Sequence, residues 1–214
     1  MTPARVVAAR NTRSAVDADR PYSESCEQNR EPILAVLQSY LSQSKRLLEI
    51  GSGTGQHAVY FAPELPALQW QTSDRVHNHA GIKAWLNAHP AGNLLAPLTL
   101  DVSSDTWPAQ QYDAVFSANT AHIMSEAEVA AMFAGVGRLL SSGGVFLLYG
   151  PFNIGGQYTA ESNERFDQWL KVQDPRMGVR DLDWLVDLAS ATGLQLQEVV
   201  DMPADNKTLV WIAE

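Results

Sequence analysis

The chain has 214 residues, of which 45% are hydrophobic, a formal net charge of -9 and a single cysteine, Cys26. This composition predicts one globular domain, and the acidity argues against a nucleic-acid or anionic-membrane partner because phosphate binding requires clustered Lys and Arg. The single cysteine excludes an intrachain disulfide and favours a reducing, cytoplasmic compartment.

The N-terminal segment, residues 1–22, is basic at its start and contains no long apolar stretch. We therefore expect a disordered tail rather than a membrane anchor or a targeting segment. Residues 23–214 then form the one domain that we predict. Its first element is an amphipathic helix, because apolar residues recur there at helical spacing. These residues are Ile33, Val36, Leu37, Tyr40 and Leu41.

Strand-like and helical segments alternate along the next part of the chain. The expected strands are residues 46–50, 68–73, 95–100, 112–118 and 143–150. The expected helices are residues 55–61, 76–89 and 125–140, a stretch through Asp167, and residues 181–193, with Asp181 as a cap. Short apolar runs separated by helices predict a parallel sheet covered on both faces. The expected fold class is therefore α/β and doubly wound.

The end of the chain departs from this alternation. Residues 194–203 and 208–214 are two strand-like segments, and the turn-rich residues 204–207 between them leave no room for a helix. Strands joined by so short a loop must be antiparallel. We therefore expect a seven-stranded, Rossmann-like sheet that ends in an antiparallel hairpin, which differs from a plain dinucleotide-binding domain.

The stretch LLEIGSGTGQHA, residues 47–58, leads from the first expected strand into a loop with glycines at alternate positions, Gly51, Gly53 and Gly55. Glycine lets the backbone turn tightly and approach a ligand, and the N–H groups at the start of the next helix can bind an anionic group. Ligands of open α/β sheets bind beyond the carboxyl ends of the strands. The position and composition of the loop therefore predict a ligand-binding site.

The spacing of the glycines separates the candidate ligands. A dinucleotide fingerprint requires a glycine where this chain has Gln56, and the chain has no G-x-x-x-x-G-K-[ST] motif for a nucleoside triphosphate. Glu49, two residues before the first glycine, would repel a pyrophosphate, but it could hold an ammonium group or orient the loop. The loop therefore favours a cationic ligand with an amino-acid end.

The loop resembles the first motif of the class I S-adenosylmethionine-dependent methyltransferases, which reads as LLEIGSGTGQ does here. The resemblance implies S-adenosylmethionine (SAM) as cofactor and a fold with an antiparallel last strand. It implies that Asp74 bonds the ribose hydroxyls, that Asp101 and the Val102 N–H meet the adenine, and that Asn119 lies against the cofactor. The implied cofactor-binding residues are Glu49, Gly51, Ser52, Gly53, Gly55, Asp74, Asp101, Val102 and Asn119.

Longer blocks look like a smaller, methyltransferase-like family of unknown function. The blocks are QNREPILAVL, ANTAHIM, YGPFNIGGQYTAESNERFDQWL, DPRMGVRDLDWL and DMPADNKTLVW. Similar blocks stand in the same order in members of that family and cover nearly everything after about residue 22. This chain differs at Thr120 and Ala121, where relatives often have a bulky residue. The resemblance implies no particular substrate.

Methyl transfer to a good nucleophile needs mainly positioning, whereas a hydroxyl or a protonated amine also needs a base. We expect His122, just beyond the fourth strand, to be that base, with a capping or packing role as the alternative. The leading helix is expected to fold over the cofactor as a lid. The expected substrate-binding residues are Asn29, Arg30, Tyr149, Phe152, Asn153 and Arg180.

The five histidines show no metal-binding pattern, so we expect no metal site. Trp85, Trp169 and Trp184 have the spacing of packing residues. The sequence predicts a cytoplasmic, SAM-dependent methyltransferase that acts on a small molecule, with no nucleic-acid or membrane partner. The alternatives are a non-catalytic protein that binds SAM or S-adenosylhomocysteine (SAH) and, less favoured, a nicotinamide-dependent oxidoreductase.

Overall fold

The computed structural model describes residues 20–104 and 106–214. The strands of its main sheet are β1 (Arg46–Ile50), β2 (Gln69–Asp74), β3 (Leu94–Thr99), β4 (Tyr112–Ala118), β5 (Leu140–Gly150), β8 (Leu194–Met202) and β9 (Asn206–Ala213). The helices are α1 (Glu24–Tyr40), α2 (Gln56–Glu64), α3 (His79–Ala88), α4 (Glu126–Leu139), α5 (Glu161–Gln173) and α6 (Leu182–Ser190). A 3-10 turn, η1 (Val76–Asn78), precedes α3.

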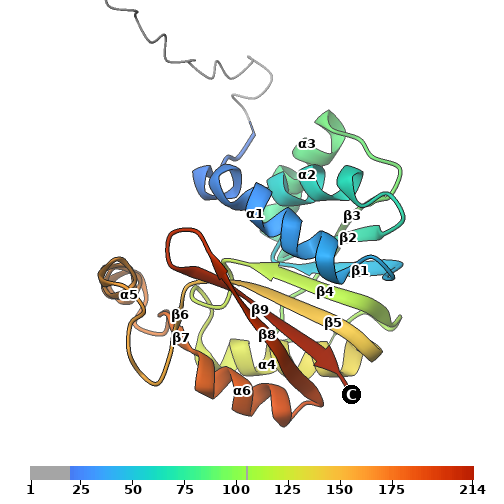
Figure 1. The fold of residues 1–214 in the computed structure, drawn as a ribbon. Helices are drawn as coiled ribbons and strands as arrows, with labels where there is room; N and C mark the ends of the chain where they lie inside the picture. Colours follow the sequence, from blue (N-terminus) through green and yellow to red (C-terminus); the bar gives the residue numbers. More distant parts are fainter. Residues whose placement is uncertain (1–19, 105) are drawn as a thin grey trace, which may run out of the picture.

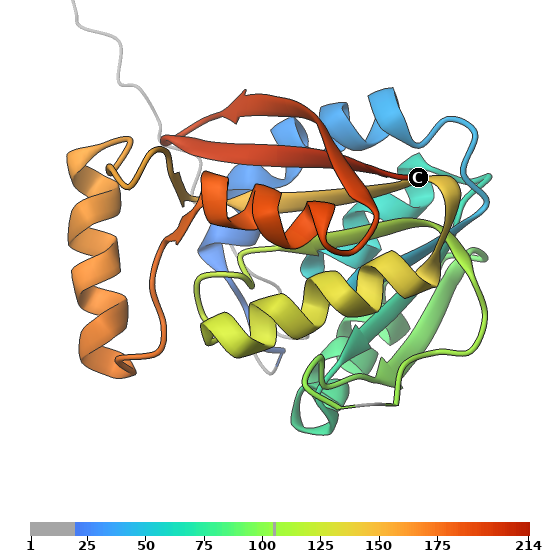
Figure 2. The ribbon, with the colours of Figure 1, turned by 90° about the horizontal axis from the view of Figure 1, so that it is seen from below.

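The seven strands form one sheet in the order β3-β2-β1-β4-β5-β9-β8. Helices α1, α2 and α3 cover one face, and α4 and α6 cover the other (Figures 1 and 2). Strands β1 to β5 pair in parallel, and β9 is antiparallel to both β5 and β8. The doubly wound α/β sheet and its C-terminal hairpin are therefore confirmed.

The hairpin turns at Ala204 and Asp205, which have φ angles of 57° and 55°. Two successive residues in the left-handed region fit a type I′ turn, whose twist matches that of the flanking strands. The strand order reverses between β1 and β4, so the carboxyl ends of these neighbouring strands open onto a crevice.

Each face of the sheet has its own apolar core. On the α1 and α2 face, the rings of Phe61, Trp70 and Phe116 pack with centroids 5.6 to 5.9 Å apart. On the other face, Phe133 packs edge-on against Trp211 at 5.5 Å. Burial on both faces holds the strands rigidly, so their carboxyl ends form a fixed platform for the site.

A second, two-stranded sheet was not predicted from the sequence. It pairs β6 (Phe152–Asn153) in parallel with β7 (Arg180–Asp181). Strands of two residues are too short to show an alternating pattern. This small sheet brackets α5, which stands beyond the strand ends, apart from the helices on the two faces (Figure 2). The expected cap of α6 is confirmed, because the Asp181 side chain accepts from the Asp183 N–H at 2.9 Å.

Two of the three tryptophans that were expected to pack do so. Trp85 is buried, and Trp184 packs against the core beneath α4 and α6. The prediction for Trp169 is wrong, because 57% of this residue is exposed on α5. Helical spacing indicated a packed residue, but α5 lies beyond the sheet and not on one of its faces.

The expected tail, residues 1–22, lies mostly outside the described residues. Of its described part, Pro21 accepts from the Trp85 indole N–H at 2.7 Å, and the Arg20 guanidinium lies 4.4 Å from the centre of the Trp85 ring. The chain thus packs on α3 from residue 20 onward. None of the helices in the described ranges is long and apolar enough to cross a membrane.

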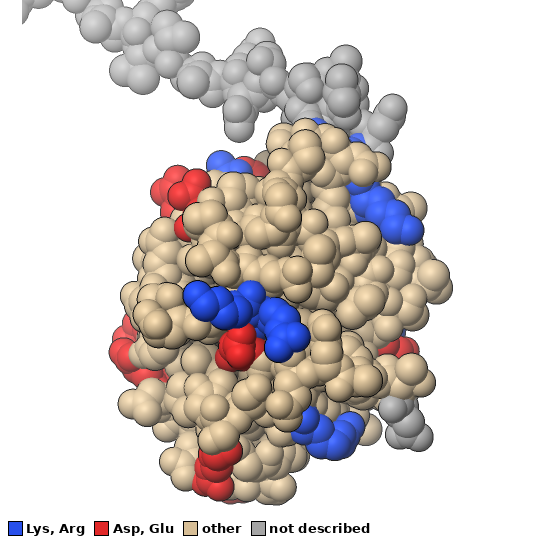
Figure 3. Space-filling model, turned by 90° about the vertical axis from the view of Figure 1, so that its right-hand side faces the viewer, with Lys and Arg blue, Asp and Glu red and all other residues tan. Residues whose placement is uncertain are grey.

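The end of the molecule opposite α5 has a mostly uncharged surface, with a small group of touching Lys or Arg and Asp or Glu side chains near its centre and others toward its edge (Figure 3). Lys45 and Arg46 mark the start of β1 there, and their N–H groups both donate to Asp113 at 2.9 Å. The strand ends that form the crevice face the other way, toward α5.

Candidate functional site

A cavity of about 350 Å³ lies at the carboxyl ends of β1, β2 and β4. Its walls come from the glycine loop after β1, the turn after β2, the segments that follow β3 and β4, and the first turn of α1. This is the crevice that the reversal of strand order creates, and the volume lies within the range of small-molecule sites.

The glycine loop takes a conformation that its residue types permit. Gly51, Gly53 and Gly55 have φ angles of 72°, 58° and 91°. The N–H groups of Gly51 and Ser52 both donate to the Ser73 carbonyl at 3.0 Å, which ties the loop to the end of β2. A Cβ on Gly51 would lie 2.6 Å from the Thr120 methyl carbon. The absence of a side chain at Gly51 thus lets the loop lie close to the segment that follows β4.

Asp74, the last residue of β2, links the glycine loop to the following turn. Its Oδ2 accepts from the Gly53 N–H at 2.8 Å, and its Oδ1 accepts from the Arg75 N–H at 2.7 Å and from Asn78 at 2.8 Å. A carboxylate offers about four acceptor positions, so Oδ2 keeps capacity for one further donor in the cavity.

Glu49 lies behind the loop and not on the cavity wall. Its Oε2 accepts from Ser52 at 2.7 Å and from the Trp70 indole at 3.0 Å. Burial raises the pKa of Glu49 to about 7, against which these two hydrogen bonds act. Glu49 was expected either to orient the loop or to hold an ammonium group. Its contacts fit the first role, and because Glu49 is not on the cavity wall it does not face a ligand there.

The first turn of α1 forms part of the cavity wall through Ser23, Ser25 and Cys26. Gln56 attaches this turn to the glycine loop. Its Oε1 accepts from the Ser23 N–H at 2.6 Å, and its Nε2 donates to the Ser23 carbonyl at 3.3 Å and to Glu27 at 3.0 Å. The residue that distinguishes this loop from a dinucleotide fingerprint therefore holds the expected lid helix.

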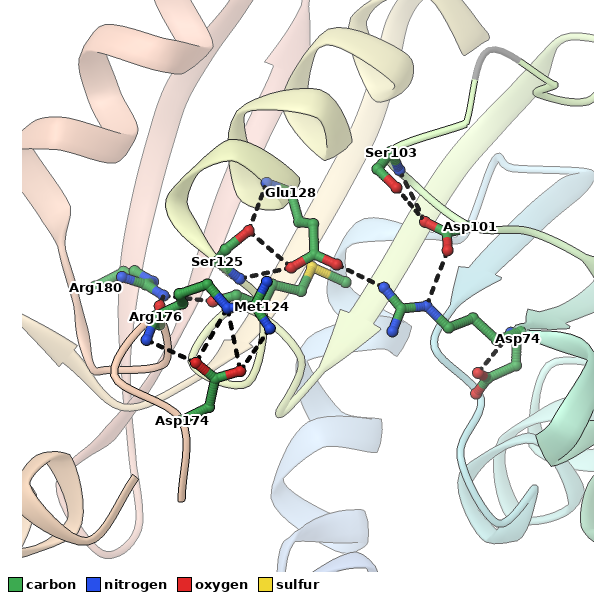
Figure 4. Close-up of polar contacts among 10 residues, drawn as sticks. Asp74, Asp101, Ser103, Met124, Ser125, Glu128, Asp174, Arg176 and Arg180 are labelled. Carbon is green, nitrogen blue, oxygen red and sulfur yellow. Dashed lines mark hydrogen bonds and ion pairs between the residues drawn. The ribbon is translucent and has the colours of Figure 1, made fainter. Parts of the chain in front are cut away.

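Asp101 lies outside the cavity wall, although its neighbour Val102 is part of it. Asp101 accepts from Ser103, and these hydrogen bonds lower its pKa against partial burial. Arg75 lies between Asp101, at 3.1 Å, and Glu128, at 2.5 Å (Figure 4). Both Arg75 and Glu128 line the cavity, so this ion-pair bridge spans its mouth between β2 and α4.

Asn119 and His122 follow β4. Asn119 has a φ of 57°, and its N–H donates to the Tyr149 carbonyl at 2.9 Å, so it joins the ends of β4 and β5. Burial, and then the Arg180 charge, lowers the pKa of His122 to about 4, so the imidazole is neutral at pH 7. A Cβ on Gly150 would lie 3.7 Å from His122 Nδ1 and 4.0 Å from Asn119 Oδ1. Both polar atoms thus face the end of β5.

The substrate residues expected in α1 have other partners. Asn29 is buried and lies 2.7 Å from His57 Nε2, and it also hydrogen-bonds the Tyr149 phenol at the end of β5. Arg30 is not on the cavity wall; it pairs with Glu27 within α1 at 2.5 Å, and its guanidinium lies 4.5 Å from the centre of the Tyr60 ring on α2. The contacts with His57, Tyr60 and Tyr149 hold α1 against α2 and the end of β5.

The other expected substrate residues also lie outside the cavity wall. Phe152 is buried in the core, and the Asn153 amide oxygen is buried without a hydrogen-bond partner among the described residues. Arg180 is buried and donates to the carbonyls of Ala121 at 3.2 Å, Arg176 at 2.7 Å and Met124. It therefore fixes the segment after β4, and its Nη1 lies 3.7 Å from the Glu126 carboxylate.

The structure brings six expected cofactor residues together on the wall, namely Gly51, Ser52, Gly53, Asp74, Val102 and Asn119. Glu49, Gly55, Asp101 and His122 lie behind or beside it. Sequence reasoning assigned no site role to several wall residues, which are Ser23, Ser25, Cys26, Thr54, His57, Arg75, His77, Asn78, Ile123, Met124 and Glu128. Positions shortly after Asp74 or Asn119 were the available signal for five of them, namely Arg75, His77, Asn78, Ile123 and Met124. No group of three or more His, Cys, Asp or Glu in the described ranges could hold a metal ion.

Solved methyltransferase structures share this architecture. An O-methyltransferase family protein from Burkholderia thailandensis aligns with a TM-score of 0.77 at 14% identity, over 86% of this chain and 56% of that one. Human N-acetylserotonin methyltransferase, in complex with SAM, aligns with a TM-score of 0.75 at 15% identity, over 89% and 53%. CalO1, a methyltransferase in calicheamicin biosynthesis in its SAH-bound form, aligns with a TM-score of 0.66 at 19% identity, over 86% and 55%.

The chain spans about half the length of these structures. At such identities the likeness shows the fold, which is that of the class I SAM-dependent methyltransferases. The model of a family described as "Protein of unknown function (DUF938)" matches residues 20–213. Because this match spans nearly the whole described chain, the protein belongs to the DUF938 family.

Proposed function

We propose that the protein is a SAM-dependent methyltransferase that acts on a small-molecule acceptor in the cytoplasm. The observation that carries the proposal is the position of Asp74, whose Oδ2 binds the glycine loop and keeps acceptor capacity directed at a cavity of about 350 Å³. Fold neighbours that are SAM-dependent methyltransferases, some with SAM or SAH bound, support it.

The wall residues fit the parts of this cofactor. Asp74 would accept from ribose hydroxyls, and the apolar Leu100 and Val102 would contact the adenine. The glycine loop and the first turn of α1 would enclose the amino-acid end. When bound, SAM supplies an electrophilic methyl group on a sulfonium, so the protein has mainly to position the acceptor.

Asn119 and His122 are the residues that we assign to the acceptor. Their Oδ1 and Nδ1 atoms face the same point beside Gly150. A neutral imidazole with a pKa of about 4 accepts a hydrogen bond readily but holds a full proton weakly. We therefore propose that His122 orients the acceptor's O–H or N–H group and that bulk water takes the proton.

Small molecules are the proposed acceptors because a net charge of -9 opposes binding to nucleic acids. The two other functions considered from the sequence make different predictions. A non-catalytic protein would bind SAM or SAH without turnover, and a nicotinamide-dependent enzyme would bind NAD.

A turnover assay tests the proposal. The protein is incubated with methyl-labelled SAM and a fractionated metabolite extract, and labelled products are counted. We expect label in at least one fraction for the wild type and for Asp201→Ala, which removes an exposed carboxylate that is not on the cavity wall. Asp74→Ala should give much less label at the same SAM concentration, because it binds SAM more weakly. Tight binding of SAM without labelled product in any fraction would favour the non-catalytic protein instead.

A further inference from the structure

Glu49 is a buried carboxylic acid directly behind the glycine loop, and only 2% of it is exposed. The Ser52 hydroxyl and the Trp70 indole, which both donate to its Oε2, are neutral groups. No ion pair within the described ranges includes Glu49. Because a buried carboxylate without a nearby cation is costly to ionise, a positive charge brought close to Glu49 would change its protonation.

The titratable groups that act on Glu49 come from two neighbouring elements. Asp74, at the end of β2, is a second carboxylate and opposes the ionisation of Glu49. Burial raises the pKa of the Cys26 thiol on α1, and the charge of Glu49 adds to this rise. Burial raises the pKa of Glu49 itself to about 7. Neutral and ionised Glu49 therefore coexist near neutral pH.

One residue separates the Glu49 carboxylate from the cavity. Ser52 lines the cavity, and its Oγ lies 2.7 Å from Glu49 Oε2. A ligand atom in contact with Ser52 therefore lies within about 10 Å of this oxygen. At that distance, and at an effective dielectric constant of about 20, a single positive charge lowers the pKa of a carboxyl group by about 1. Charge in the cavity thus acts on Glu49 without touching it.

We propose that Glu49 makes the site prefer SAM to SAH, by releasing a proton when SAM binds and keeping it when SAH binds. This inference rests on the proposed function and makes Glu49 a specificity-determining residue. The two ligands share their adenosine and amino-acid parts, but SAM has a positively charged sulfonium where SAH has a neutral thioether. Ionised Glu49 attracts only the sulfonium. Once the methyl group is transferred, Glu49 takes a proton back from water and the product loses this attraction.

A purely structural role for Glu49 predicts a different result. As a support for the loop, Glu49 would affect the affinities for SAM and SAH equally, because both ligands contact the same wall. Glu49→Gln separates the two roles. The glutamine keeps an acceptor oxygen for Ser52 and Trp70 and resembles the protonated acid, so it retains the support and removes the charge.

Isothermal titration calorimetry in buffers of different ionisation enthalpy counts the protons released per ligand bound. At pH 7 we expect the wild type to release about 0.4 proton more with SAM than with SAH, because the ionised fraction of Glu49 rises from about a half to about nine-tenths. Glu49→Gln should lose this excess, and Glu161→Gln, at an exposed carboxylate on α5, should keep it. An equal excess in the wild type and in Glu49→Gln would overturn the proposal.

The pH dependence of affinity gives a second test, which does not require Glu49→Gln to fold. In the wild type, the preference for SAM over SAH should rise about fourfold between pH 5.5 and pH 7, where the α-amino groups of both ligands stay mostly protonated. Two histidines also line the cavity. Burial lowers the pKa of His57 to about 4, so His57 is neutral in this range. His77→Gln tests the other and should keep the fourfold rise.

A flat preference in the wild type, or a rise that His77→Gln abolishes, would overturn the role of Glu49. The same titrations separate this inference from the proposed function. Wild type that binds neither SAM nor SAH would contradict the proposed function and, with it, the inference. Wild type that binds both ligands with equal proton release would leave the proposed function standing and overturn the inference alone.

Discussion

The carboxyl edge of the sheet has two halves that are built in different ways. Beyond β1 and β2, main-chain groups make most of the contacts: the N–H groups of Gly51 and Ser52 bind the Ser73 carbonyl, and Asp74 binds the Gly53 N–H. Beyond β4 and β5, side chains from distant elements meet, as when the His122 ring contacts Phe166. The first half is a cradle of fixed shape, whereas the second half can change with its side chains.

The difference separates the two tasks of the proposed enzyme. A main-chain cradle suits a ligand that never varies, such as a cofactor, because its shape depends on a few glycines and one carboxylate. A side-chain surface suits the acceptor, which is the variable partner. Substitutions in the first half should therefore change cofactor binding and stability, and substitutions in the second half should change acceptor choice.

The largest expected effect in the cradle is on the pH dependence of stability, through Glu49→Gln. Burial raises the pKa of Glu49 from its ordinary 4.5 to about 7. The unfolded chain loses this proton near pH 4.5, whereas the folded chain keeps it until about pH 7. The contribution of Glu49 to the free energy of unfolding therefore falls by about 3 kcal/mol as pH rises through this range. Glu49→Gln should remove this pH dependence.

The measurement for Glu49 is the free energy of unfolding in urea between pH 5 and pH 8. Burial lowers the pKa values of His57 and His122 to about 4, so both the wild type and Glu49→Gln lose stability as pH falls below the ordinary pKa of histidine. The informative quantity is therefore the difference between the wild type and Glu49→Gln in the free energy of unfolding at each pH. Glu161→Gln, at an exposed carboxylate, should run parallel to the wild type. A parallel curve for Glu49→Gln would show that Glu49 ionises normally.

Asp74→Ala should weaken SAM binding by about a hundredfold or more, because both a charged acceptor and the Gly53 anchor are lost. Isothermal titration calorimetry measures this directly. Asp201→Ala is the control, and Trp169→Ala should leave the affinity for SAM unchanged. If Trp169→Ala weakened SAM as strongly as Asp74→Ala, the two halves would not be separate in function.

Gln56→Ala should loosen the first turn of α1, since Gln56 binds both main-chain groups of Ser23. We expect about tenfold weaker SAM binding and faster amide hydrogen exchange at residues 23–27. Asn93→Ala, which removes a half-buried amide that also binds main-chain carbonyls, should not change exchange at these residues. Unchanged exchange in Gln56→Ala would show that α1 is held in place by its apolar face alone.

The smallest expected effect is that of Arg75→Gln, which opens the ion-pair bridge between Asp101 and Glu128. Half-exposed pairs contribute less than about 1 kcal/mol, so we expect SAM to dissociate about threefold faster, with less difference in high salt. Stopped-flow dissociation measures the rate, and Arg165→Gln, at an exposed pair on α5, is the control. A slower rate in Arg75→Gln would contradict a closing role for the bridge.

The fold and the cradle could be predicted because their signals are local. The alternation of apolar strands and helices set the sheet, and the positions of Gly51, Gly53 and Asp74 directly after strands placed them at the carboxyl edge. Asp101 shows the limit of such reasoning. It follows its strand as expected, but its carboxylate pairs with Arg75 and accepts a hydrogen bond from Ser103. Its neighbour Val102, and not Asp101 itself, lines the cavity.

The acceptor half could not be predicted because it depends on contacts between distant segments. Nothing near His122 in the sequence indicates that Phe166 lies against it, and the two-residue strands that bracket α5 leave no periodic pattern. Arg180 illustrates the same limit: its charge indicated a ligand, whereas the fold uses it to hold the carbonyls after β4. Long-range packing decides such roles.

Titration of the wild type with SAM, SAH and NAD tests the central claim most directly, since the claim is that the cavity beside Asp74 binds the sulfur cofactor. The account predicts calorimetric binding of SAM and SAH at one site per chain and no detectable binding of NAD. Binding of NAD, with neither sulfur ligand bound, would contradict it.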